Sequence, residues 1–421
     1  MKPFCLWLLL APASLLAADG VPAGWQTWAP RAEIAPRTFV DNVHYRTHPG
    51  SLAVSGNGNA GEHGGWERVV SGIEPGSWYR FTAYYRVAGV PYESMQILPR
   101  VDWRTSAGKP AGRADYPYRA IREGEWNRVA EDVQAPAGTA TATLQLFLFN
   151  APQGTVWWDD VSFEKVEPPA PRKVTVASLN LRPRNTHSAE ENIRLFAAGV
   201  DPAIPQKTDI ILLPESITVV GNGKTYLDVA ETVPGPTTEA LGAVAKRRSS
   251  YLVVGIIERE GAILYNTDVL IGRHGEIAGK YRKVQLPDEE VQGGVTPGND
   301  YPVFQTDFGT IGLMTCYDVM FPDTAHALAR QGAEIILMPI WGGDETLAKA
   351  RAIENKVFLV ASGYDHPTYI MDPDGERLAT ATEKGTAAVF TIDLSKRYLD
   401  YWMGDMRARR RKEERVDLRS R

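Results

Sequence analysis

The sequence predicts a two-domain protein in which an all-β domain precedes an α/β domain. The chain has 421 residues, of which 43% are hydrophobic and 23% charged, enough apolar side chains for two ordinary globular cores. A proline-rich linker at residues 168–172 divides the chain. Short runs of alternating apolar and polar residues precede it, and strand-like runs that alternate with amphipathic helices follow it.

Residues 1–18 predict a secretory signal peptide. Lys2 provides a short basic start, Phe4 to Leu16 is mostly apolar, and two alanines form a small-residue processing site. The apolar stretch is too short to cross a bilayer comfortably, so we expect no stable membrane span. The mature protein is expected to begin near Asp19, without Cys5, and to be exported to the periplasm or the extracellular medium.

Residues 19–167 predict a β-sandwich. Runs such as Tyr79–Tyr85 and Thr141–Phe149 have strand periodicity, and turn residues separate them. The closing run Gly154–Phe163, with its Trp-Asp-Asp-Val centre, resembles the last strand of jelly-roll carbohydrate-binding-like modules. That resemblance implies a jelly-roll-like domain with a glycan as a candidate partner.

Eight of the eleven tryptophans lie in this first domain, and two roles are open for them. They either fill the sandwich core or stack on sugar rings from exposed positions. Asp159 and Asp160 are candidate ligands for a structural calcium ion, because carboxylate oxygens suit that ion. The eight tryptophans are Trp25, Trp28, Trp66, Trp78, Trp103, Trp126, Trp157 and Trp158.

Residues 173–398 predict the α/β domain. Six apolar, β-branched runs have the length of buried strands. A capping box that begins at Ser188 opens one amphipathic helix, and residues 238–248 and 324–331 form two others. The strand-like runs are 174–179, 210–213, 251–257, 311–314, 335–338 and 357–360.

Residues 399–421 predict a basic, solvated C-terminal tail, with a polyanion or surface contact as the alternative. From Arg407 to Arg421 there are eight Lys or Arg residues and three Asp or Glu residues. The whole chain carries 46 basic and 51 acidic residues, a formal charge of −5. We therefore expect no nucleic-acid partner.

Three strand ends in the α/β domain carry residues that can do chemistry. Glu215 follows the run 210–213 after a single proline, Pro214, and a buried acid there must be paired or catalytic. Lys283 lies in a Tyr-Arg-Lys segment that by itself is typical of a surface strand. Cys316, the only cysteine of the mature chain, follows the run 311–314 on a strand-to-helix turn. It is either a buried structural residue or a nucleophile close to backbone N–H groups.

The order Glu215, Lys283, Cys316 resembles the catalytic order of the carbon–nitrogen hydrolase family, also called the nitrilase superfamily. The resemblance covers roughly residues 173–395 and is closest to the amidase-like branch. It implies a four-layer α-β-β-α sandwich, no cofactor, and a homodimer or higher homo-oligomer. Further matching segments are 296–298, 307–312, 332–336, 351–355 and 372–375.

The same resemblance implies how the site residues divide the hydrolysis of an amide. Glu215 would take the proton of Cys316, which attacks the carbonyl and forms a thioester, and would pass that proton to the departing amine. Lys283 and the backbone N–H of Tyr317 would hold the oxyanion. The family's second glutamate, which would position substrate or water and keep the lysine charged, falls on Glu290.

Two details of the site carry alternatives. Glu289 is the alternative to Glu290 as the second glutamate. Tyr317 and Trp341 are candidate walls of the substrate-binding pocket, with core packing as the other reading of Trp341. The motif Cys-Tyr-Asp is similar to the amide and carbamoyl-amide hydrolysers of the family, whereas nitrile hydrolysers typically carry Cys-Trp-Glu. We therefore expect an exported hydrolase of a non-peptide C–N bond in a small linear amide.

Other functions stay open at this point. The acyl group could pass to an amine instead of water, which would make the protein an N-acyltransferase, or the fold could be a vestigial hydrolase in a glycan-binding protein. A Cys–His mechanism would need His187, His274, His326 or His366, none of which lies in a protease-like context. No histidine pair or cysteine cluster has ligand spacing, so we expect no metal site.

Overall fold

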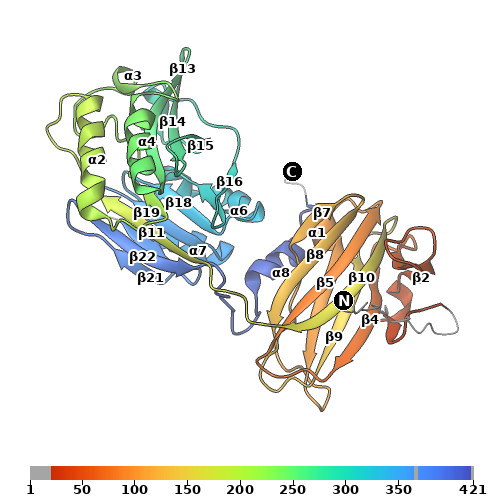
Figure 1. The fold of residues 1–421 in the computed structure, drawn as a ribbon. Coiled ribbons are helices and arrows are strands. Elements are labelled where there is room, and N and C mark those ends of the chain that lie inside the picture. The colour runs from red at the N-terminus through yellow and green to blue at the C-terminus, as the bar shows by residue number, and fades with distance from the viewer. Residues whose placement is uncertain (1–19, 365–367, 419–421) are drawn as a thin grey trace, which may run out of the picture. The chain divides into compact units, whose positions relative to one another are not determined.

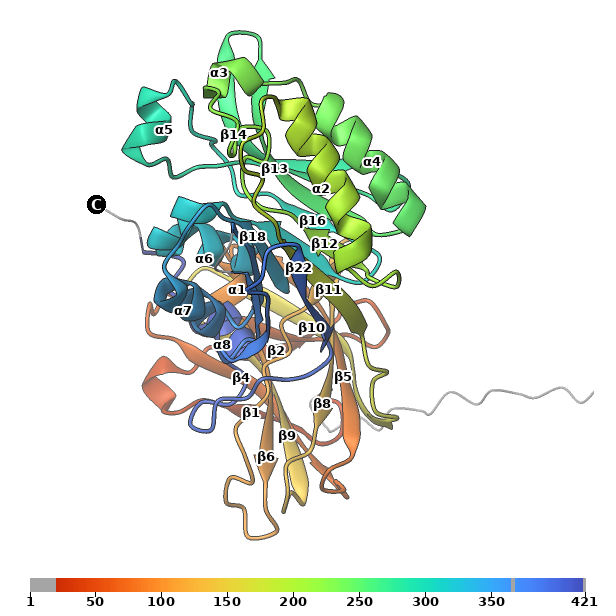
Figure 2. The same cartoon turned by 90° about the vertical axis from the view of Figure 1, so that its left-hand side faces the viewer.

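The computed structural model describes residues 20–364 and 368–418, and it divides the chain into two compact units. The first unit contains the residues up to Pro169 and those from Leu399 onward, and the second extends from Ala170 to Tyr398. Figure 1 and Figure 2 show the elements of each unit. The predicted signal peptide and His366 lie outside the described residues. In the described ranges, no helix has the length and apolar character that a membrane crossing needs.

Two antiparallel sheets form the first unit, with short helices η1 (Ala32–Ile34) and α1 (Glu93–Gln96). One sheet has the order β1 (Trp25–Trp28), β4 (His63–Ser71), β9 (Thr141–Phe149), β6 (Ile97–Arg104). The other has the order β2 (Arg37–Asp41), β3 (Ser51–Ser55), β10 (Thr155–Val166), β5 (Trp78–Ala88), β8 (Trp126–Gln134), β7 (Ala120–Glu123). Both sheets contribute side chains to one buried core, which is how a sandwich is held together.

The tryptophans of this unit are largely interior. Trp66, Trp103 and Trp158 are buried in the core between the sheets. Trp126 and Trp157 are buried in a second cluster, which lies on the opposite face of the six-stranded sheet because residues alternate along a strand. For these five residues the structure supports core filling, and they are not available for stacking on a sugar.

The two acids of the closing strand are engaged by the protein itself. Asp159 Oδ2 accepts hydrogen bonds from the backbone N of Arg46 at 2.7 Å and of Thr47 at 3.2 Å. Asp160 forms an ion pair with the side chain of Arg46. Both carboxylates thus hold the loop around Arg46 against β10, and in the described part of the chain no group of three or more His, Cys, Asp or Glu residues could hold a metal.

The prediction of a solvated basic tail is wrong for the described residues after Leu399. Residues Met406–Glu413 form helix α8, which packs against α1 within the first unit. The stem of Lys412 is buried, and its Nζ donates a hydrogen bond to the carbonyl oxygen of Ile97 at 2.9 Å. Burial lowers the pKa of this amine to about 8. The charge count could not reveal this contact, because a lysine buries its aliphatic stem as readily as an apolar residue does.

Two six-stranded sheets form the second unit, and we name them after β11 and β18. The β11 sheet has the order β15 (Ile277–Arg282), β14 (Ile263–Ile271), β13 (Tyr251–Glu260), β12 (Ile210–Leu212), β11 (Lys173–Asn180), β22 (Thr386–Asp393). The β18 sheet has the order β16 (Val303–Gln305), β17 (Thr310–Leu313), β18 (Ile335–Pro339), β19 (Phe358–Ser362), β20 (Tyr369–Met371), β21 (Arg377–Thr380). In each sheet three neighbouring strands are parallel: β11, β12 and β13 in one, β17, β18 and β19 in the other.

The two sheets pack face to face between two layers of helices. Successive residues alternate between layers: Val176 lies in the core between the sheets, and Ala177 lies in the core under the helices. Helices α2 (Ala189–Ala203) and α4 (Pro236–Arg248) cover the β11 sheet. Helices α6 (Pro322–Arg330) and α7 (Glu345–Asn355) cover the β18 sheet. The predicted α/β class is confirmed, and the layer order is the α-β-β-α that the family resemblance implies.

Candidate active site

A turn after β12 positions Glu215. The backbone N of Leu213 still bonds to the carbonyl oxygen of Val253 on β13, at 2.8 Å, and the chain then bends inward. The carbonyl oxygen of Glu215 accepts a hydrogen bond from the hydroxyl of Tyr364. Gly255 lies so close that a Cβ at that position would be 2.7 Å from the Cα of Glu215. The backbone of Glu215 can therefore take this place only because residue 255 has no side chain.

We expect Gly255→Ala to lower kcat by about 10²-fold, because a displacement of a catalytic group by about 1 Å has an effect of that size. The added methyl group must push the backbone of Glu215 away from β13. Steady-state assays measure the loss of kcat, and the thermal midpoint measures what the displaced backbone does to stability. Gly61→Ala is the matched control, since its added Cβ meets no atom closer than 3.4 Å. A Gly255→Ala variant with the wild-type kcat would contradict the prediction.

Lys283 lies between two carboxylates. It follows β15, and its Nζ is 2.9 Å from Oε1 of Glu215 and 2.6 Å from Oε1 of Glu290. Helix α5 (Asp288–Gln292) carries Glu290 and leaves Glu289 exposed, so the structure brings Glu290 and not its alternative to the lysine. Burial by itself lowers the pKa of Lys283, but the charges of Glu215 and Glu290 outweigh burial and raise it. The side chain is therefore held as an ammonium ion.

Asn266 on β14 joins the two glutamates from the other side. Its Nδ2 donates to Oε1 of Glu215 at 2.8 Å and to Oε1 of Glu290 at 3.2 Å. The same oxygen of each carboxylate thus meets both Lys283 and Asn266. Within the described residues, Oε2 of Glu215 and Oε2 of Glu290 are buried without a hydrogen-bond partner. These two oxygens remain free to accept a proton or a hydrogen bond from substrate or water.

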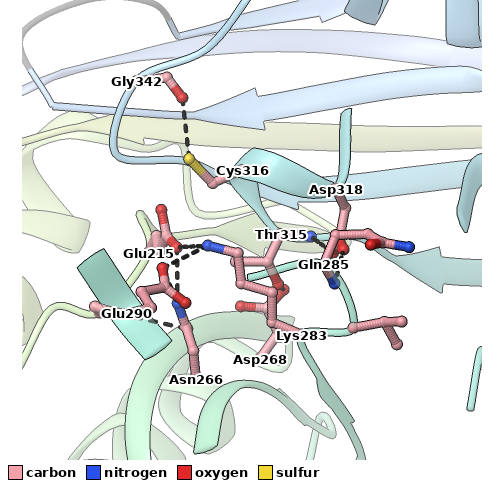
Figure 3. A network of polar contacts seen from close by, with 12 residues as sticks. Glu215, Asn266, Asp268, Lys283, Gln285, Glu290, Thr315, Cys316, Asp318 and Gly342 are labelled. Carbon is pink, nitrogen blue, oxygen red and sulfur yellow. Dashed lines mark hydrogen bonds and ion pairs between the residues drawn. The ribbon is translucent and has the colours of Figure 1, made fainter. Parts of the chain in front are cut away.

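Cys316 begins helix η2 (Cys316–Met320), and two residues, Met314 and Thr315, separate it from the end of β17 (Thr310–Leu313). It has a left-handed backbone with φ of 42°, and its Sγ donates to the carbonyl oxygen of Gly342 at 3.2 Å. In the view of Figure 3 the sulfur of Cys316 is directed at Gly342 and lies above the side-chain ends of Glu215 and Lys283. Burial and then the charge of Glu215 raise the pKa of the Cys316 thiol to about 12, although Lys283 opposes them. A thiol in this state needs a base before it can attack.

Two buried acids beside this cluster were missed by the sequence reasoning. Asp318 follows Cys316 by two residues and is buried together with Tyr281, whose hydroxyl donates to Asp318 Oδ2 at 2.8 Å. Asp268 on β14 accepts a hydrogen bond from Oγ1 of Thr315 at 2.8 Å. The Asp of Cys-Tyr-Asp was visible in the sequence as a clue to substrate. Its burial was not, because the strands that cover it are distant in the chain.

A pocket of about 390 Å³ opens beside the cluster. Trp341 and Tyr226 are among its lining residues. Burial first, and then the charges of Glu290 and Glu215, raise the pKa of Tyr226. The side of the pocket that Tyr226 forms therefore lies close to the two carboxylates. Trp341 packs edge-on against Tyr364, with ring centroids 5.1 Å apart. The structure thus places Trp341 at the pocket. Tyr317 is absent from the described lining residues, and its ring packs against that of Phe321 with ring centroids 5.7 Å apart.

Histidines take no part in this arrangement as far as the structure describes them. His187 and His274 are exposed, and the ring of His326 on α6 bonds to Asn355. The charged side chains that shift the titration of Cys316 are Glu215 and Lys283. The geometry therefore offers the thiol a carboxylate and an ammonium ion in place of an imidazole.

The second unit also matches known proteins. Residues 175–399 match the carbon-nitrogen hydrolase family. The omega-amidase NIT2 of Homo sapiens is 31% identical over 233 residues, 49% of this chain and 84% of that protein. The deaminated glutathione amidase of Synechocystis sp. is 31% identical over 254 residues, 53% of this chain and 92% of that protein.

Two solved structures resemble part of this chain. Nit3 of Saccharomyces cerevisiae, a member of branch 10 of the nitrilase superfamily, has a TM-score of 0.47 at 21% identity and covers 52% of this chain and 90% of its own. An amidase from Nesterenkonia sp. has a TM-score of 0.46 at 25% identity and covers 53% and 93%.

The sequence matches identify the class of this enzyme as an amidase-type carbon–nitrogen hydrolase. The chain belongs to the carbon-nitrogen hydrolase family, whose match covers more than half of its length.

Proposed function

We propose that the protein hydrolyses a small linear amide through a thioester on Cys316, with Glu215 and Lys283 completing a Glu-Lys-Cys triad. The observation that carries this proposal is that in Glu215 and in Glu290 one carboxylate oxygen is hydrogen-bonded and the other is not. Lys283 occupies Oε1 of Glu215, and the other oxygen, Oε2, has no partner in the described part of the chain. A buried carboxylate with one fixed and one free oxygen is suited to act as a general base.

The proposed reaction proceeds in two halves. Glu215 takes the thiol proton of Cys316 as sulfur attacks the amide carbonyl, and Lys283 stabilises the resulting oxyanion together with the backbone N–H of Tyr317. The C–N bond then breaks, Glu215 gives its proton to the departing nitrogen, and ammonia leaves a primary amide. Glu215 next removes a proton from water as the water oxygen attacks the thioester carbonyl, the C–S bond breaks, and Glu215 returns the proton to the sulfur as the acid leaves. Glu290 positions the water and keeps the lysine charged.

We further propose that the substrate carries a carboxylate at the end distant from its amide. Lys224 is the formally charged side chain among the described residues that line the pocket, where it accompanies Thr225, Tyr226 and Trp341. A cation at the pocket favours an anionic group on the ligand.

Lys224→Met is expected to raise KM about tenfold for an amide with a distal carboxylate, equivalent to about 1.4 kcal/mol of lost binding. KM for a neutral amide of the same length should stay unchanged, because only the charge of the lysine is removed. Lys207→Met, which alters an exposed lysine in the loop before β12, is the matched control. Equal effects of Lys224→Met on both substrates would show that the lysine does not read the carboxylate.

The test of the proposed function is ammonia release from a panel of amides, nitriles and carbamoyl compounds, with intact-mass detection of the acyl adduct. We expect amides to be cleaved and nitriles to be poor substrates. Competing amines added to the assay separate hydrolysis from the alternative, N-acyl transfer, by the appearance of a new amide product. A protein that releases no ammonia from any compound would overturn the proposal and leave a vestigial hydrolase fold.

We also propose that the protein is exported, that its first unit binds a saccharide, and that it forms a homodimer or higher homo-oligomer. The signal-like residues 1–18 support export.

A pocket of about 490 Å³ in the first unit supports a saccharide site, since its lining includes Tyr92, Asn150 and the ion-paired side chains of Arg415 and Asp417. N-terminal sequencing, calorimetry with oligosaccharides and sedimentation analysis test the three statements in turn.

A further inference from the structure

The carboxylate of Asp318 joins the segment that carries the thiol to the segment that carries the lysine (Figure 3). On the thiol side, its Oδ2 accepts a hydrogen bond from the backbone N of Thr315 at 2.9 Å. On the lysine side, the same oxygen accepts from the hydroxyl of Tyr281 at 2.8 Å. Oδ1 accepts from the backbone N of Gln285 at 2.9 Å. Three donors from two distant parts of the chain therefore meet one side chain.

These contacts are placed symmetrically about the catalytic groups. Thr315 immediately precedes Cys316, and Tyr281 and Gln285 stand two residues before and two residues after Lys283. Asp318 thus accepts hydrogen bonds from the lysine segment on both sides of Lys283. The other anchor of the thiol turn is Asp268, which holds the hydroxyl of Thr315.

We propose that Asp318 is a positioning residue that fixes the Sγ of Cys316 relative to the Nζ of Lys283, an inference that rests on the proposed function. The carboxylate itself does not touch the reacting atoms. Its three hydrogen bonds set the relative position of the two segments, and its full burial prevents water from replacing those bonds. The thiol reaches a carbonyl carbon whose oxygen meets the ammonium ion only if that relative position is kept.

A carboxylate is the group that this arrangement requires. All three neighbours of Asp318 donate, so its side chain must only accept. An asparagine in its place always directs its Nδ2 hydrogens at a donor, either at Gln285 N or at the Thr315 N and Tyr281 hydroxyl pair. The isosteric Asp318→Asn variant therefore breaks the connection on one side without removing volume.

Steady-state kinetics and thiol alkylation of Asp318→Asn test the proposal. We expect kcat to fall about 10²-fold with KM little changed, as for a small misplacement of catalytic groups. We also expect the rate at which iodoacetamide alkylates Cys316 to change, because the thiol turn loses its fixed place beside Lys283. Measurements well below the thermal midpoint keep unfolding out of both readings.

Asp372→Asn is the matched control. Asp372 is also buried, and its Oδ1 accepts from the backbone N of Asp374 at 3.0 Å and of Glu376 at 2.9 Å, in a turn between β20 and β21. It should lose stability without any change in kcat. The proposal is overturned if both variants lose stability alike and both keep the wild-type kcat.

A second variant serves if Asp318→Asn does not fold. Tyr281→Phe removes one of the three hydrogen bonds to Asp318, together with the bond that the Tyr281 hydroxyl accepts from the backbone N of Val284, and leaves no donor facing a donor on Asp318. We expect a smaller loss of kcat, about tenfold, and an unchanged kcat would overturn the proposal equally. A wild-type protein without amidase activity would instead refute the proposed function, and the alkylation rates would still report on the thiol turn.

Discussion

Replacing Cys316 by alanine is expected to lower amide hydrolysis by at least about 10³-fold, because the variant has lost the atom that forms the acyl-enzyme. Lys283 and both glutamates remain in place and can still bind the amide, so KM should change far less than kcat. The chain offers no substitute, since its other cysteine, Cys5, lies in the predicted signal peptide. Ammonia release measures the loss, and intact mass shows whether an acyl adduct forms.

Two further observations give that result its meaning. The thermal midpoint of Cys316→Ala should stay close to the wild-type value, because a small, partly exposed side chain contributes little burial. Cys316→Ser should be almost as inactive, since Glu215 cannot take the proton of a hydroxyl as readily as that of a thiol. Ammonia release by Cys316→Ala at the wild-type rate would remove the thioester from the mechanism.

The second unit was predictable from sequence because each layer left a local signal. Strands buried on both faces appeared as continuous apolar runs, such as that of β18. The start of α2 was marked by Ser188, whose Oγ accepts from the backbone N of Glu191 at 3.2 Å, as predicted. Helix α8 gave no such signal. Five of its eight residues are Arg or Lys and the helix has almost no apolar stripe, so only tertiary contacts such as that of Lys412 reveal that it is packed.

The candidate site shows the same division between local and distant information. Glu215 and Cys316 were identifiable because each follows an apolar strand within a few residues and so lies beyond the carboxyl end of that strand. Asn266 was not, because it stands inside β14, where alternation marks it only as an ordinary polar position. Its role depends on the antiparallel pairing of β14 with β13 and β15, which sets it opposite both glutamates. Residues that connect others are the hardest to recognise from one sequence.

Lys283→Met is expected to remove activity and also to destabilise the protein by about 3–5 kcal/mol at neutral pH, the usual result of removing one partner from a buried ion pair. The wild-type cluster holds one ammonium ion between two buried carboxylates. Without it, Glu215 and Glu290 repel each other in a buried site, with Asn266 as their remaining shared donor. Loss of the oxyanion partner should lower kcat about 10²- to 10³-fold.

The destabilisation should depend on pH in a defined direction. In the wild type, burial raises the pKa of Glu290 above its ordinary value of 4.5, and the charge of Lys283 opposes that rise. Removing the lysine raises the pKa further, so between pH 4.5 and this new value the folded variant binds more protons than the unfolded chain. Its stability must therefore fall as pH rises through that interval. Thermal midpoints of variant and wild type should approach each other at acidic pH and diverge toward neutral pH.

The double variant Lys283→Met with Glu290→Gln separates the two roles of the lysine. With Lys283, Glu215 and Glu290 all ionised, the wild-type cluster carries a net charge of −1. The single variant carries −2, and the double variant carries −1 again. We expect the double variant to regain most of the lost stability and its pH dependence to weaken, while kcat stays low because no ammonium ion meets the oxyanion. A double variant that regained activity together with stability would mean that Lys283 serves only to compensate charge. A single variant as stable as the wild type at every pH would mean that the two carboxylates are not both ionised around it.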